Sequence, residues 1–152
     1  MTIGIAATCI ATLAASITLG GAIYEALLID RAWPATPSII QPARGGIDRR
    51  LFWIPAHVLF ELPIFVAIWT SWSLHPVRSM LLLALASHFA LRAWSFLYFV
   101  PLAVKFEQAR ELEPGLAARV GAWVRLSRWR IPLQFITLAG SACAAFRIAS
   151  DL

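Results

Sequence analysis

Four long apolar stretches constrain this 152-residue chain more than any other feature. They cover about residues 3–29, 51–74, 80–104 and 131–148. Each is close to the ~20 residues that a helix needs to cross ~30 Å of hydrocarbon. No alternating apolar and polar pattern indicates a membrane barrel. The sequence therefore predicts an all-α integral membrane four-helix bundle that forms a single transmembrane domain over residues 1–152.

The net charge of +5 follows the expected loops of this bundle. Only Arg78 falls in the second loop and only Arg147 near the C-terminus. The positive-inside rule then places loops one and three in the cytoplasm and both termini outside, in a bacterial-type inner (plasma) membrane. Because topology accounts for the charge, no nucleic-acid partner is indicated. The first and third loops carry ten of the 13 Lys and Arg residues: Arg31, Arg44, Arg49, Arg50, Lys105, Arg110, Arg119, Arg125, Arg128 and Arg130.

The third loop also predicts a short additional helix. Leu116, Val120, Trp123 and Val124 recur at helical spacing, opposite basic residues. Such a pattern is typical of a helix that lies in the membrane interface. By the same reasoning, we expect Trp33 after the first stretch to lie at the level of the headgroups.

Ionisable residues interrupt the second and third apolar stretches at helical spacing. His57 and Glu61 are four residues apart, as are His88 and Arg92, so each pair shares one face of its helix. A charge in hydrocarbon is costly and usually faces the protein interior, where it marks function. We therefore expect the two polar faces to meet inside the bundle. Further polar residues are predicted to line the same pocket, toward its cytoplasmic end: Glu25, Ser95, Tyr98 and Gln134.

Three chemistries are compatible with this cluster. The simplest is a structural ion pair between Glu61 and Arg92. The second is acid and base catalysis by His57 and Glu61, with Arg92 stabilising an anion and His88 orienting the other groups. The third is a metal site, with iron held by His57, Glu61 and His88, or haem held by the two histidines. We favour no cofactor from these residues, and Arg92 beside the ligands would oppose a cation.

Scattered residues give the chain a resemblance to a known family, the small four-helix membrane proteins grouped with fungal anthrone oxygenases. The resemblance implies oxidation of a polycyclic aromatic compound such as an anthrone, without an established cofactor. It rests on these positions: Gly21, Tyr24, Glu25, Trp33, Pro34, Phe52, Trp53, Arg92, Trp94, Tyr98 and Pro101. A second resemblance, of His57 and Glu61 to the His and Glu pair of emopamil-binding-type sterol isomerases, implies an isomerase.

The leading functional hypothesis is a small integral-membrane enzyme that acts on a lipophilic substrate in an intramembrane polar pocket and is oxygenase-like. Two alternatives stay open: an isomerase with a His and Glu acid-base pair, and a non-enzymatic accessory subunit. The seven Trp residues would suit an accessory subunit if they covered its outer faces. The expected partners are membrane lipids and a lipophilic small molecule, with a homo-oligomer or a larger membrane complex also open.

Overall fold

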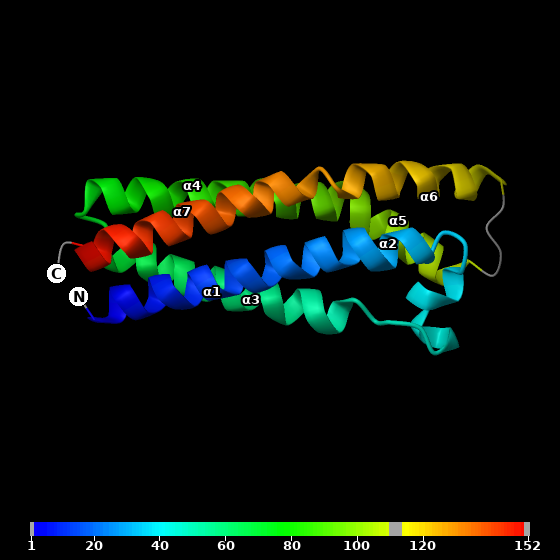
Figure 1. The fold of residues 1–152 in the computed structure, drawn as a ribbon, viewed down its shortest axis with the longest axis horizontal. Helices are drawn as coiled ribbons and strands as arrows, with labels where there is room; N and C mark the ends of the chain where they lie inside the picture. Colours follow the sequence, from blue (N-terminus) through cyan, green and yellow to red (C-terminus); the bar gives the residue numbers. More distant parts are fainter. Residues whose placement is uncertain (1, 110–113, 151–152) are drawn as a thin grey trace.

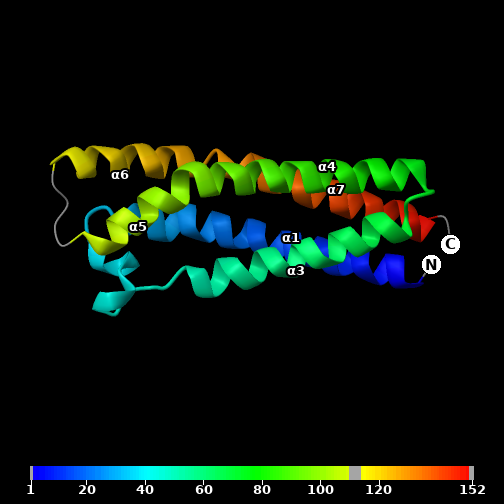
Figure 2. The ribbon, with the colours of Figure 1, turned by 180° about the vertical axis from the view of Figure 1, so that it is seen from behind.

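Four long helical rods run side by side in a computed structural model that describes residues 2–109 and 114–150 (Figures 1 and 2). Within these residues, four helices are long and apolar enough to cross a membrane, at Thr2–Ala32, Arg50–Thr70, His75–Gln108 and Gly115–Ser150. These helices confirm the all-α prediction. Arg110, one of the basic residues used to predict topology, lies outside the described residues.

Each rod is built from one or more helical segments. The rods contain α1 (Thr2–Tyr24), η1 (Glu25–Ile29), α2 (Asp30–Ala32), α3 (Arg50–Thr70), α4 (His75–Trp94), η4 (Ser95–Phe99), α5 (Val100–Gln108), α6 (Pro114–Ser127) and α7 (Arg130–Ser150). Here η1 and η4 are π-helical turns, and two short 3₁₀ helices, η2 (Pro37–Ile40) and η3 (Pro42–Arg44), form the first loop.

Small side chains on α1 let this helix pack closely on two neighbours. Ala7, Ala11 and Ala15 are buried, as their spacing predicts, and α1 packs closely on both α3 and α7. Helix α4 packs mainly on α7, where Gly140 lies against the backbone of α4. Small residues at these contacts let helix backbones approach each other. The apolar core along these contacts is therefore made of α1, α3, α4 and α7.

Helices α3 and α4 diverge although they are consecutive in the chain. A short turn at residues 71–74 joins them at one end, and the two ribbons separate toward the other end (Figure 2). Direct contact between α3 and α4 is sparse compared with the contacts of α1 with α3 and of α4 with α7. Helices α3 and α4 therefore pack on α1 and α7 more than on each other.

A second apolar core closes the end of the bundle that carries the long loops. Trp33 is fully buried in it, so its ring cannot contact lipid headgroups as the predicted anchor would. Its indole nitrogen donates to buried Asp30 at 3.1 Å, and its ring packs edge-on against Trp123 of α6. A buried hydrogen-bond partner allows Trp to enter a core instead of anchoring at an interface.

The predicted helix in the third loop is present as α6, but its orientation differs from the prediction. It continues along the axis of α7 after a break at residues 128–129, instead of lying across the end of the bundle (Figures 1 and 2). Its apolar face, with Val120, Trp123 and Val124, packs into the second core. The periodicity therefore marked a protein-facing surface.

Both chain ends lie at the same end of the bundle as the α3–α4 turn (Figures 1 and 2). The first loop, the last residues of α5 and the first residues of α6 lie at the opposite end. The chain therefore runs up, down, up and down, as the four apolar stretches predict.

We expect Gly140→Ala to destabilise the protein. A Cβ at this position would lie 2.9 Å from the backbone oxygen of Met80, so α4 and α7 would have to separate. Such overpacking costs ~1–3 kcal/mol, which exceeds the gain of up to ~1 kcal/mol in helix propensity. Gly20→Ala is the matched control, because nothing lies within 4 Å of its added Cβ. Thermal unfolding in detergent should show a lower midpoint for Gly140→Ala only; equal midpoints would contradict the close contact.

Candidate functional site

An ion-paired cluster joins α3 to α4 in the middle of the bundle. Oε1 of Glu61 lies 3.0 Å from Nε2 of His88 and 3.3 Å from Nε of Arg92. The His88 side chain is almost fully buried, while Glu61 and Arg92 each keep about a quarter of their side-chain exposure. The prediction that the polar faces of these two helices meet is confirmed. The charges compensate each other where apolar packing between the helices is thin.

His57 lies beside this cluster without joining its hydrogen bonds. Its ring stacks on Trp53 at a centroid distance of 5.5 Å and meets the ring of His88 edge-on at 5.2 Å. Among the described residues, Nδ1 of His57 is buried and has no hydrogen-bond partner. The partner of Glu61 is thus His88 on the facing helix, although His57 is one turn away on the same helix. A buried nitrogen without a partner is unusual in a stable core and indicates a site that a ligand can fill.

A pocket of about 300 Å³ opens next to His57, between α3 and the α4–η4–α5 rod. His57 and Arg92 line it, whereas Glu61 and His88 lie behind its wall. This volume is at the lower end of the range of small-molecule sites. The residues that line the pocket are Glu25, Arg49, Arg50, Trp53, Ile54, His57, Leu91, Arg92, Ser95, Phe96, Phe99, Val100, Ala103, Val104, Glu107, Trp123, Arg130 and Gln134.

Three of the four residues predicted to line the pocket do so. Glu25, Ser95 and Gln134 are among its walls, and Oε1 of Gln134 is a second buried polar atom without a partner in the described residues. Tyr98 does not line the pocket. Its ring packs edge-on against that of Phe99, with the ring centroids 5.0 Å apart. It lies three residues after Ser95, within the π-helical turn. Sequence spacing on a regular helix does not anticipate the altered directions of side chains in such a turn.

The pocket carries more positive charge than the sequence predicted. Arg49 pairs with Glu107 at 3.5 Å and stacks on Trp123, while Arg50 pairs with Asp48 at 2.8 Å. The hydrogen bonds from Arg50 hold the pKa of Asp48 below its ordinary value. Arg130 is the fourth lining arginine, together with Arg92. The sequence placed Arg49, Arg50 and Arg130 among loop charges because nothing in their spacing indicates that the loop end folds over the pocket.

Both π-helical turns begin at residues that line the pocket. Glu25 is the first residue of η1 and accepts a hydrogen bond of 2.9 Å from Nε1 of Trp53, and Ser95 is the first residue of η4. Pro101 supplies a local reason for η4, because it cannot donate a backbone hydrogen bond and its ring would clash with the preceding turn of an α-helix. Such π turns occur often at functional sites.

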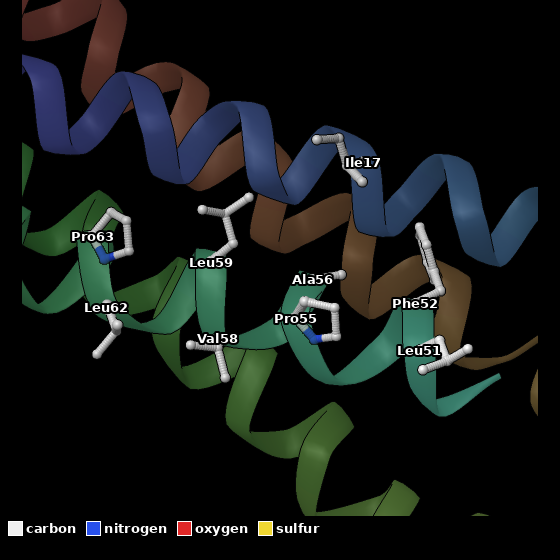
Figure 3. A pocket seen from close by; sticks show the side chains of 9 residues that line it. All are labelled: Ile17, Leu51, Phe52, Pro55, Ala56, Val58, Leu59, Leu62 and Pro63. Carbon is white, nitrogen blue, oxygen red and sulfur yellow. The ribbon is translucent and has the colours of Figure 1, made fainter. Parts of the chain in front are cut away.

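A larger hollow of about 510 Å³ lies on the outer side of α1 and α3 (Figure 3). Every residue that lines it is apolar, from Ile17 on α1 to Leu51 and Pro63 on α3. It offers no group that could hold a polar atom or move a proton. The smaller polar pocket is therefore the candidate functional site.

Among the described residues, no group of three or more His, Cys, Asp or Glu side chains is arranged to hold a metal ion. The predicted metal set of His57, Glu61 and His88 is brought together, but Nε2 of His88 faces the carboxylate of Glu61. Arg92 approaches the same carboxylate oxygen. The arrangement resembles a hydrogen-bond network more than a coordination site.

No known protein family, curated protein or solved structure matches the chain.

The pairing of Glu61 with Arg92 should appear as a coupling free energy. We expect a double-mutant cycle of Glu61→Gln and Arg92→Gln to give ~0.5–3 kcal/mol in unfolding free energy, as for groups in direct contact. The cycle Asp48→Asn and Arg50→Gln is the control, because this more exposed pair should show a smaller coupling, within the ~0.2–1 kcal/mol of surface ion pairs. Equal coupling in both cycles would contradict a partly desolvated ion pair between α3 and α4.

Proposed function

We propose that this protein is a multi-pass membrane enzyme that removes a proton from a lipophilic carbonyl compound in the pocket between α3 and α4. The observation that carries the proposal concerns His57, which lines the same pocket as Arg92 and whose buried Nδ1 has no hydrogen-bond partner among the described residues. A base with a free nitrogen and a cation that can stabilise an anion are the two groups that enolate formation needs.

The proton transfer assigns a role to each residue. A C–H bond breaks at a carbon that is beside the substrate carbonyl or conjugated to it through an aromatic ring. Its proton goes to Nδ1 of His57, and its electron pair moves through the conjugated system onto the carbonyl oxygen. The guanidinium of Arg92 stabilises that oxygen, and Glu61 positions Arg92 and His88 through its contacts of 3.3 and 3.0 Å. Glu61 is thus a positioning residue, because it does not line the pocket.

An oxygenase-like outcome follows if the enolate reacts with dioxygen. Addition of dioxygen at the carbon gives a peroxide anion, which takes the proton back from His57. Loss of water then leaves a new carbonyl, so a methylene group and dioxygen become a carbonyl and water. Return of the proton to another carbon would instead be an isomerisation. The resemblance to anthrone oxygenases favours the first outcome, since an anthrone carries such a methylene group beside aromatic rings and opposite a carbonyl.

A non-enzymatic accessory subunit would use Trp residues on its outer faces to contact a larger complex. Trp33 and Trp123 are buried in the second core and cannot serve such contacts. Trp69 and Trp72 are exposed near the α3–α4 turn, where a membrane-interface belt would also place them. We therefore keep the enzyme as the favoured function.

Turnover by the purified protein in lipid nanodiscs tests the proposal. With anthrone as probe and dioxygen present, the protein should consume oxygen and form the quinone. We expect His57→Ala to lower kcat by ~10²-fold or more, the usual contribution of a general base. Arg92→Gln should lower it by a similar factor because it removes the group that stabilises the anion. Glu61→Gln should abolish turnover by releasing Arg92 and His88 from their positions.

The matched control for His57 is His75→Ala, because His75 is exposed at the opposite end of α4 and should keep full activity. Thermal unfolding of each variant separates loss of chemistry from loss of fold. Unchanged turnover in His57→Ala would remove this residue from the mechanism. A wild-type protein that neither oxidises nor isomerises such ketones would overturn the proposed function.

We also propose that the chain spans a bacterial-type inner membrane, with the long loops in the cytoplasm and both termini outside. Labelling of single cysteines with an impermeant maleimide in spheroplasts tests this topology, after Cys9 and Cys143 are replaced by Ala. A cysteine at exposed Ser73 should react in intact spheroplasts. A cysteine at Arg44 in η3 should react only after lysis; the reverse pattern would show the opposite orientation.

A further inference from the structure

Arg130 occupies an unusual place among the charged residues of the pocket. It is the first residue of α7 and lines the pocket at the junction of α6 and α7. Its guanidinium lies over the ring of Phe99, with Cζ 4.2 Å from the ring centroid, and 5.9 Å from that of Trp123. Stacking on aromatic faces holds the planar group in one orientation.

Within residues 2–109 and 114–150, Arg130 has no ion-pair partner. Arg49, Arg50 and Arg92 each have a carboxylate oxygen within 3.5 Å. Among the described residues, no carboxylate lies within 4.0 Å of Arg130. Its polar contacts are two long hydrogen bonds of 3.4 Å, to the carbonyl oxygen of Ser127 and to Oγ of Ser95. A guanidinium has five N–H donors, so most of its donor capacity stays unused.

Two carboxylates act on Arg130 through space, but other donors occupy them. Glu25 accepts from Nε1 of Trp53 at 2.9 Å. Asp30 accepts from Nε1 of Trp33 at 3.1 Å and from Oγ of Ser127 at 2.9 Å. These bonds fix both acids away from the guanidinium. The negative potential of Glu25 would also disfavour a dianion in the pocket.

We propose that Arg130 binds the carboxylate of a lipophilic ligand, so that the substrate of this pocket is an amphiphilic carboxylate. This inference rests on the proposed function for the pocket and names its substrate class. A carboxylate matches the planar fork of the guanidinium and carries only one negative charge. The apolar body of the ligand packs on the side chains that line the rest of the pocket: Ile54, Leu91, Phe96, Val100 and Val104.

Quenching of Trp fluorescence by a brominated ligand tests the inference. The probe is 9,10-dibromostearate, compared with its methyl ester, in nanodiscs of phosphatidylcholine, whose headgroup has no carboxylate. Trp53 and Trp123 line the pocket and report binding, while exposed Trp69, Trp72 and Trp129 are replaced by Phe. We expect saturable quenching by the carboxylate at alkaline pH, and an affinity at least about tenfold weaker for the ester.

Variants at Arg130 assign the effect to this residue. Arg130→Gln should weaken binding of the carboxylate about tenfold or more and leave binding of the ester unchanged. Arg119→Gln is the matched control, because Arg119 is exposed on α6 outside the pocket. Equal affinity for acid and ester, or no effect of Arg130→Gln, would overturn the inference.

Binding and turnover separate this inference from the proposed function. Saturable binding of the carboxylate that depends on Arg130, without turnover of any ketone, would support the ligand class and refute the enzyme. Turnover that depends on His57, without preference for the carboxylate, would support the enzyme and refute the role of Arg130.

Discussion

The structure of the site depends on the contacts of the Glu61 carboxylate with His88 and Arg92. Helices α3 and α4 have few direct contacts, because α3 packs mainly on α1 and α4 on α7. Glu61 bridges them by meeting His88 at 3.0 Å and Arg92 at 3.3 Å. A charge among apolar helices is costly without such partners, so the three groups hold each other in place. The cluster joins two helices that diverge from their connecting turn.

The pocket is a consequence of that divergence and of two widened helical turns. The π turns start at Glu25 and Ser95, on opposite rods, and both residues line the pocket. The second apolar core, built around Trp33 and Trp123, caps the loop end. Polar groups therefore line a space whose walls also include apolar residues of α4 and α5. This combination suits a ligand with an apolar body and one or two polar groups.

The sequence predicts the helices and the central polar cluster because both depend on local periodicity. His57, Glu61, His88 and Arg92 fall where helical spacing places them, and Glu61 does meet the facing helix. The burial of Trp33 depends on Asp30 and on α6, which is remote in sequence, so a rule for membrane belts did not predict it. The role of Arg130 in the pocket depends on the break between α6 and α7, which no apolar pattern marks.

Photocrosslinking tests most directly whether the polar pocket is the ligand site. A diazirine derivative of an aromatic ketone would be irradiated with the protein in nanodiscs, and the adducts mapped by mass spectrometry. We expect adducts on Leu91, Phe96 and Val100, which line the pocket, and we expect excess unlabelled ketone to suppress them. Adducts on Ile17 or Leu62, which line the larger apolar hollow, would contradict a ligand site in the polar pocket if the competitor did not reduce them.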